Sequence, residues 1–148
     1  MNDIPIKQLL LFRAKIKKPF ELTVDGTSMI PILHPGDRIE ICARDNYAVG
    51  DILVFFYKNN TLLVHRLLRV ENGRYLCKGD NSFRLEDIRK EDIVGAVCLE
   101  HDANNTPEFI ADSYSVSRIF RQNGYDTEKT KLTQEYKNYA KKHLGEDI

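Results

Sequence analysis

Ser28 stands in the stretch DGTSMIPILHPGDRI, residues 25–39, where glycines and prolines interrupt a sequence that otherwise alternates like a β-strand. Such residues favour sharp turns, and a turn can lift a side chain out of a packed scaffold. A serine hydroxyl is a weak nucleophile at neutral pH unless a neighbouring base takes its proton during attack. The stretch therefore suggests a serine nucleophile, and the rest of the chain must supply the base.

The best candidate for that base is His65. It lies in the apolar run LLVHRLL, where an ionisable side chain is costly to bury without a compensating partner. The remaining histidines stand in turn-like or polar segments: His34, His101 and His143. Taken alone, a histidine in such a strand is more often a satisfied core residue, so the interpretation depends on its combination with Ser28. A lysine base such as Lys58 or Lys78 would need strong desolvation to act near neutral pH.

A histidine base benefits from a carboxylate that fixes its tautomer and stabilises the imidazolium formed in the reaction. Asp80 follows the strand-like run that comes after the His65 run, and a hairpin would place these two runs side by side. Glu86 and Asp87 lie a little further along. Gly-Asp-Asn alone is typical of a turn, so spacing by itself does not choose among these acids.

Residues 21–100 have the pattern of β structure. Short apolar or alternating runs are separated by turn residues: FELTVDG, RIEICAR, DILVFFYKNN, TLLVHRLLRVENG, RYLCKGDN and IVGAVCLE. The pair Asn72-Gly73 favours a hairpin, because both residues tolerate positive φ. No helices alternate with these strands, so we expect a mainly β fold with a coiled or barrel-like antiparallel sheet.

The stretch before this β region predicts an amphipathic helix, with Asp3 as N-cap and Pro5 in the first turn. We expect it to dock on the domain's own core, although peripheral contact with a membrane surface stays open. Its longest apolar run, residues 9–12, is far shorter than the ~20 residues of a membrane span, so we expect neither a transmembrane anchor nor an export signal.

The chain changes character after Asp102. HDANNTPEF is polar and loop-like, and the following residues are helix formers with a break at Gly124 and a second helix over residues 128–144. We therefore expect a β domain with its N-terminal helix over residues 1–101. Residues 102–148 would form a helical extension packed on the same domain.

Composition limits the function classes. Lys and Arg number 22, as do Asp and Glu, so the net charge is zero and nucleic acid is not an expected partner. Three widely spaced cysteines, Cys42, Cys77 and Cys98, match neither a zinc site nor a disulfide scaffold. Buried reduced thiols in a reducing compartment are the favoured interpretation. We expect no metal and no cofactor.

Four ordered blocks carry a family resemblance: GTSMIPILHPGDRI, VGDILVFF, LLVHRLL and KGDNSFRLED. Over about residues 22–98 the chain resembles the signal peptidase I and LexA-type serine peptidase superfamily. Its archaeal and endoplasmic-reticulum branch uses a histidine in a VHR setting, which this chain has. The resemblance implies Ser28 as nucleophile, His65 as general base and Asp80 as acidic partner. Asp87 lies near a second functional aspartate of that branch, where Glu86 competes for the position.

The resemblance also implies acyl transfer at a peptide bond, with a substrate bound as an added β-strand. The backbone N–H of Ser28 is the natural oxyanion donor. Gly26 stands where the lysine-type enzymes can have a helping hydroxyl, so the second donor stays open. Gly26, Thr27, Met29 and Pro31 would shape the turn and the adjacent substrate groove.

The chain also departs from its relatives. We expect no membrane span, and because 27 residues precede Ser28 we also expect no DNA-binding domain of the LexA type. We therefore expect a stand-alone, soluble, cytoplasmic peptidase that cleaves a peptide or protein in trans. The oligomeric state is not set by the sequence. The alternative is a catalytically inactive peptide-binding or regulatory module of the same fold, because fold does not determine function.

Overall fold

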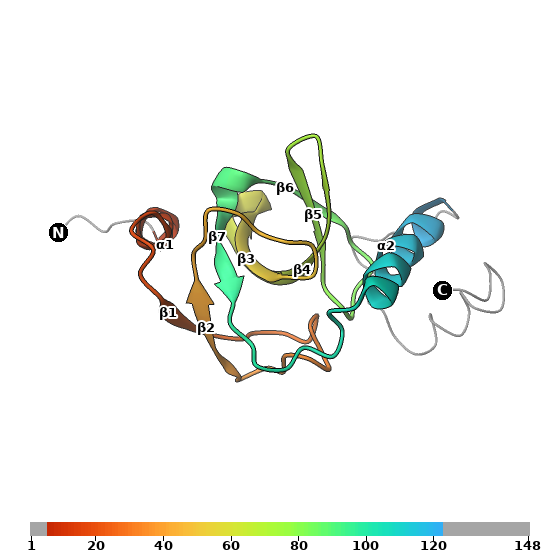
Figure 1. Cartoon of the computed structure of the whole chain (residues 1–148), viewed down its shortest axis with the longest axis horizontal. Helices are drawn as coiled ribbons and strands as arrows, with labels where there is room; N and C mark the ends of the chain where they lie inside the picture. The colour runs from red at the N-terminus through yellow and green to blue at the C-terminus, as the bar shows by residue number, and fades with distance from the viewer. Residues whose placement is uncertain (1–5, 123–148) are drawn as a thin grey trace.

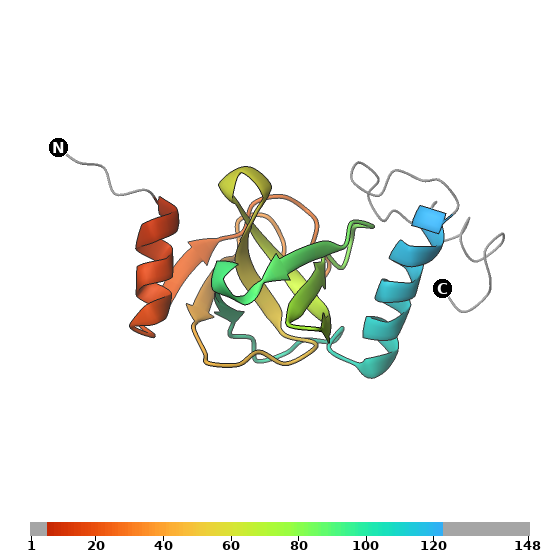
Figure 2. The same ribbon diagram turned by 90° about the horizontal axis from the view of Figure 1, so that it is seen from above.

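The computed structural model describes residues 6–122, and these form a curled antiparallel sheet between two helices (Figures 1 and 2). The strands are β1 (Phe20–Thr23), β2 (Arg38–Cys42), β3 (Ile52–Tyr57), β4 (Thr61–Glu71), β5 (Arg74–Lys78), β6 (Glu86–Arg89) and β7 (Ile93–Val97). Two short 3-10 turns, Lys58–Asn60 and Lys90–Asp92, connect β3 to β4 and β6 to β7. Asp3, Pro5, Gly124, His143 and the helix expected over residues 128–144 lie outside the described residues.

The strand order is β1-β2-β7-β3-β4-β5-β6, and every neighbouring pair is antiparallel. The expected mainly β fold with a coiled antiparallel sheet is confirmed. The sheet does not close into a barrel within the described residues, because β1 and β6 are its two ends and do not pair with each other. Each therefore keeps an edge without a neighbouring strand.

The six predicted runs correspond to β1 to β5 and β7. Asn72 and Gly73 have φ angles of 50° and 74°, so the expected hairpin joins β4 to β5. The sequence pattern did not indicate β6, because three of its four residues are charged. Its alternation buries Glu86 and exposes Asp87, as the period of two of a strand requires.

Two apolar clusters lie on the two faces of β3. Ile52, Val54 and Phe56 pack in one cluster together with Met29. Leu53 and Phe55 pack in the other cluster, with Leu67 and Cys77. Because successive side chains of a strand point to opposite faces, β3 supplies a core to both sides of the sheet. Met29 thereby fixes the turn that contains its neighbour Ser28.

Helix α1 (Ile6–Lys15) and helix α2 (Pro107–Gln122) lie at opposite ends of the molecule (Figure 2). Leu10 of α1 is buried against the sheet, as expected for docking on the core. Helix α2 begins earlier than expected, inside the predicted loop, because Pro107 suits a first helical position and Thr106 caps the helix. The Thr106 hydroxyl accepts a hydrogen bond from the Phe109 N–H at 3.1 Å.

Helix α2 is held to the sheet by polar contacts. The Lys78 ammonium at the end of β5 donates to the Ser113 hydroxyl at 2.7 Å, and the Ser117 hydroxyl donates to the carbonyl oxygen of Phe83. Both serines are buried. Within residues 6–122, neither helix has the length and the apolar character that a membrane crossing requires.

Candidate active site

Ser28 opens a tight turn just beyond β1. The Met29 carbonyl accepts backbone hydrogen bonds from Ile32 and Leu33, and the Met29 side chain is almost fully buried. Gly26 precedes the turn with a φ of 81°, in the left-handed region that glycine adopts without strain. The turn expected around Ser28 is therefore present, and it leaves the Ser28 side chain partly exposed.

A second loop, between β5 and β6, holds this turn from the side. The Asn81 N–H donates to the Ser28 carbonyl at 2.8 Å, and the Asn81 side chain donates to the Thr27 carbonyl at 3.2 Å. Gly79 packs so closely that a Cβ added there would lie 2.8 Å from the Ser28 carbonyl oxygen. The backbone of Ser28 is thus fixed independently of its hydroxyl.

The structure brings Ser28 and His65 together. The Ser28 Oγ lies 2.9 Å from the Nε2 of His65, which is 5% exposed in the first half of β4. The Phe55 ring on β3 packs edge-on against the imidazole, with 6.1 Å between ring centroids. The histidine therefore stands on a central, rigid strand, with its Nε2 directed at the hydroxyl.

The carboxylate that contacts this histidine is Glu86. Its Oε1 lies 2.5 Å from the Nδ1 of His65, and its Oε2 accepts a hydrogen bond from the Arg84 Nε at 3.0 Å. Glu86 is fully buried. A carboxylate accepting from Nδ1–H leaves the lone pair of Nε2 directed at the serine, which is the tautomer a general base needs.

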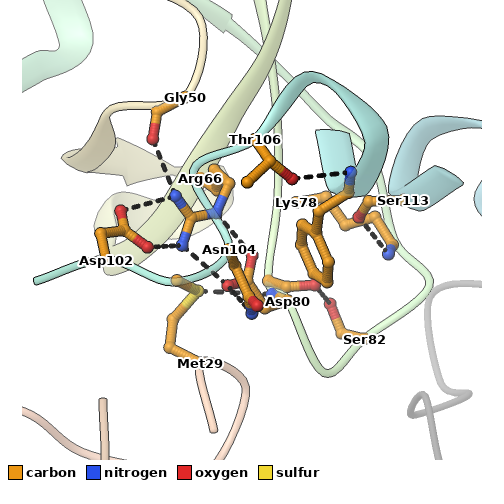
Figure 3. A network of polar contacts seen from close by, with 12 residues as sticks. Met29, Gly50, Arg66, Lys78, Asp80, Ser82, Asp102, Asn104, Thr106 and Ser113 are labelled. Carbon is orange, nitrogen blue, oxygen red and sulfur yellow. Dashed lines mark hydrogen bonds and ion pairs between the residues drawn. The ribbon is translucent and has the colours of Figure 1, made fainter. Parts of the chain in front are cut away.

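Asp80 does not contact His65, contrary to the expectation from sequence. Its two oxygens accept from the Nε and one terminal nitrogen of Arg66, each at 2.9 Å, and the Asn104 amide donates to it at 3.1 Å (Figure 3). Arg66 follows His65 on β4, so its side chain points to the opposite face of the strand. Asp80 therefore lies on the Arg66 face, and Glu86 lies on the His65 face.

Arg66 is fully buried and completely paired. Its terminal nitrogens also donate to both oxygens of Asp102 and to the Gly50 carbonyl, all at 2.8 Å (Figure 3). Burial opposes the charged form, but the hydrogen bonds that Arg66 donates to Asp80 and Asp102 outweigh it and raise the pKa of Arg66. This cluster ties β4 to the loop beside Ser28 and to the segment after β7.

Asp87 is also remote from the histidine. It is exposed on β6, and it accepts a hydrogen bond from the Arg74 Nε at 2.7 Å. Glu86 and Asp87 are neighbours in sequence, and the pleat of β6 sends their side chains to opposite faces. The signal that could have found Glu86 is the alternation of EDIR between an inward and an outward face.

A pocket of about 180 Å³ opens beside the Ser28 hydroxyl. Two stretches line it together with Ser28 and Met29, residues 22–26 at the end of β1 and residues 62–65 of β4. Within the described part of the chain, β1 pairs only with β2, and residues 61–65 of β4 pair only with β3. Two unpaired strand edges therefore border the pocket.

The remaining predicted residues take different positions. Gly26 and Met29 line the pocket, whereas the Thr27 carbonyl binds Asn81 and the exposed Pro31 binds the His34 ring through its carbonyl oxygen. Lys78 is buried against Ser113 of α2, and Lys58 is exposed in the turn after β3. The Ser28 hydroxyl is bonded to His65.

The cysteines differ from the expectation of buried thiols. Cys77 is buried, but Cys98 is exposed, and its Sγ lies 2.7 Å from the Sγ of Cys42. Partial removal from water, the contact with Cys42 and the charge of Glu40 raise the pKa of Cys98 to about 11. Among residues 6–122, no group of three or more His, Cys, Asp or Glu side chains is placed to hold a metal ion.

Comparison with known proteins agrees with this geometry at the level of the family. Residues 2–98 match the model of the Peptidase S24-like family, and the chain belongs to that family. At the level of the superfamily it is therefore a protein of the serine peptidase type, and that superfamily includes LexA and signal peptidase I. Searches of curated proteins and of solved structures found no match.

Proposed function

We propose that this chain is a histidine-type serine endopeptidase that cleaves a peptide or protein substrate in trans. Ser28 is the nucleophile, His65 is the general base, and Glu86 positions the base. The observation that carries the proposal is the continuous chain of contacts from the Ser28 hydroxyl through both nitrogens of His65 to Glu86. Ser28 lies in the turn after β1, His65 lies on β4 and Glu86 lies on β6. The three groups therefore meet through the tertiary structure.

The reaction follows from these contacts. Ser28 Oγ attacks the scissile carbonyl carbon while His65 Nε2 takes the hydroxyl proton, and the C–N bond breaks as His65 returns that proton to the leaving amine. An acyl-serine ester remains. His65 then deprotonates water, whose oxygen attacks the ester, and the proton goes back to Ser28. Glu86 stabilises the imidazolium that forms in both acylation and deacylation.

The oxyanion of each tetrahedral intermediate needs fixed donors. Within residues 6–122 the backbone N–H of Ser28 donates to no protein acceptor, and this supports its assignment as one donor. A second donor is not assigned. The turn is held by Asn81 and Met29 rather than by this N–H, so a developing oxyanion could accept from it without loss of a native hydrogen bond.

The substrate would bind as an extended strand between β1 and β4. Their facing edges have unpaired backbone groups beside Ser28, and an added strand satisfies such groups while its alternate side chains enter pockets. The lining side chains at the pocket are largely apolar, among them Leu22, Val24 and Leu62. A pocket of about 180 Å³ suits a small apolar side chain next to the scissile bond.

A soluble and cytoplasmic location of the peptidase is part of this proposal, as is the absence of nucleic acid among its partners. The second candidate is a peptide-binding module without catalysis. The same free strand edges would serve it, but it would need neither the buried contact of His65 with Glu86 nor a hydroxyl within 2.9 Å of Nε2. We therefore favour the enzyme.

The decisive experiment is mass spectrometry of the purified chain after reaction with a serine-directed acylating probe. We expect stoichiometric labelling of Ser28 in the unaltered chain and none in Ser28→Ala or His65→Ala. Lys78→Ala is the matched test of a lysine base, because Lys78 is buried and directly precedes Gly79 of the β5–β6 loop.

Two outcomes would contradict the proposal. If a folded chain shows no labelling above the Ser28→Ala background, the binding module becomes the better account. If labelling survives His65→Ala but is lost in Lys78→Ala, the base is assigned to the wrong residue. Thermal unfolding of each variant separates these outcomes from loss of the fold.

A further inference from the structure

Helix α1 has two apolar faces, and only one of them packs on the protein. Leu10 is buried and Leu11 is partly buried against the sheet. The other face exposes four large apolar side chains: Ile6 (69%), Leu9 (42%), Phe12 (59%) and Ile16 (52%). Ile16 belongs to this face because its N–H still donates to the Phe12 carbonyl, which extends the helical turn.

The spacing of these four residues makes them a single stripe. Steps of three, three and four residues keep them within about 120° of each other around a helix. We call Ile6, Leu9, Phe12 and Ile16 the outer stripe. Figures 1 and 2 show α1 at the end of the molecule away from α2, so one side of the helix faces away from the sheet.

The charged residues of the segment that carries the outer stripe have one sign. Residues 6–20 contain five Lys or Arg and no Asp or Glu, although the chain as a whole has zero net charge. Asp92 and Asp45 pair with Lys7 and Lys17. Arg13, Lys15 and Lys18 have no acidic partner within the described residues. An apolar stripe flanked by cations that are not neutralised by acidic side chains is the arrangement that binds the surface of an anionic bilayer.

We propose that the outer stripe of α1 docks this protein on an anionic membrane surface. The helix would lie in the plane of the bilayer, with Leu9 and Phe12 among the acyl chains and Lys15 and Lys18 among the lipid headgroups. A second copy of the chain fits less well. Four side chains expose roughly a few hundred Å², below the ~800 Å² that each partner buries in a standard interface.

The test is flotation of the purified full chain with vesicles. Phosphatidylcholine vesicles containing phosphatidylglycerol are expected to carry the protein at ~0.1 M salt, and less of it at ~0.5 M salt, because salt screens the attraction. Phosphatidylcholine alone is expected to bind much less. The Ser28→Ala variant should float equally well, so docking is measured separately from peptidase activity.

Two variants with matched controls locate the surface. Leu9→Asn/Phe12→Asn and Lys15→Gln/Lys18→Gln are each expected to lower the partition coefficient about tenfold or more. Val70→Asn and Arg69→Gln change an exposed apolar and an exposed basic residue on β4, and neither should alter binding. All four positions of the two variants are exposed, so the fold should persist. Circular dichroism would verify this.

The proposal is overturned if the unaltered chain does not float with anionic vesicles at low salt, or if the β4 controls lose as much binding as the α1 variants. It is also overturned if light scattering shows a dimer that Leu9→Asn/Phe12→Asn dissociates while vesicle binding is absent. That last result would assign the outer stripe to a second copy of the chain.

Discussion

At the scale of residues, the contact of Glu86 with His65 matters most for the chemistry. Both oxygens of this buried carboxylate are used, one by His65 and one by Arg84. The carboxylate thus fixes the orientation of the imidazole and stabilises its protonated form. Asp80 and Asp87 cannot substitute for it, because neither faces His65. Asp80 is bound to Arg66, and Asp87 is bound to Arg74.

Replacing Glu86 with Gln should lower the rate of Ser28 acylation by roughly 10² to 10⁴. The amide has the same shape, but it removes the negative charge and can force the wrong tautomer on His65. The measurement is the acylation rate constant from time-resolved mass spectrometry. Asp87→Asn, one residue away, is the matched control and should leave the rate unchanged. Equal rates for Glu86→Gln and the unaltered chain would remove Glu86 from the mechanism.

Cys98 provides a prediction that depends on pH. Its pKa of about 11 means that the reactive thiolate is scarce at neutral pH and increases as the pH rises. Alkylation of Cys98 by iodoacetamide in the reduced chain should therefore accelerate about tenfold per pH unit between pH 8 and 10. Cys77 is buried and its pKa is raised, so it should react only on unfolding. Rapid alkylation of Cys98 at pH 7 would disagree with this environment.

At the scale of elements, the site depends on the close packing of two loops. The loop after β5 donates a backbone hydrogen bond to the Ser28 carbonyl, and Gly79 leaves no space for a side chain against that carbonyl. The free edges of β1 and β4 lie beside the same turn. Small displacements of the β5–β6 loop therefore move the nucleophile relative to His65.

The change Gly79→Ala tests this packing. Its Cβ would lie 2.8 Å from the Ser28 carbonyl oxygen and 3.0 Å from the Ser28 Cβ, so the backbone must shift. Misplacement of a reacting group by about 1 Å can cost on the order of 10²-fold in rate. We expect a loss of that size in Ser28 acylation. Ser82→Ala removes only a long hydrogen bond, from the Ser82 hydroxyl to the Gly79 carbonyl at 3.3 Å, and should have little effect. A large effect there would assign the constraint to Ser82.

At the scale of the whole molecule, the Arg66 cluster joins segments that are far apart in the chain. It connects β4, the loop after β5 and the segment that leads into α2. Asp102 and Asn104 lie beyond residues 2–98, the part that matches the family model. The C-terminal segment therefore completes the pairing of a buried arginine that stands next to the histidine of the site.

Asp80→Asn should destabilise the chain by about 1–3 kcal/mol, because the amide nitrogen replaces one oxygen and leaves a buried N–H of Arg66 without its acceptor. Asp87→Asn breaks an exposed ion pair and should cost at most about 1 kcal/mol. Urea unfolding of both variants measures the difference. Similar values for the two would show that burial of the Arg66 cluster does not govern stability. The comparison also separates the structural role of Asp80 from the chemical role of Glu86.

Much of this protein follows from its sequence. Alternating runs and turn residues predict six of the seven described strands, the hairpin at Asn72-Gly73 and the first helix. They also single out Ser28 and His65, which lie within hydrogen-bond distance in the structure. These features depend on residue type within short stretches, because a few neighbouring residues determine a turn and show that a histidine stands among apolar residues.

Only the tertiary structure determines which carboxylate contacts His65. Asp80, Glu86 and Asp87 differ in the face of the strand or loop on which each lies. The short, charged strand β6 has little sequence signal, and its pairing with β5 orients Glu86 inward. The approach of Cys42 to Cys98 and the exposure of the outer stripe likewise depend on how β2, β7 and α1 pack. Register and packing are long-range properties, and residue spacing along the chain does not encode them directly.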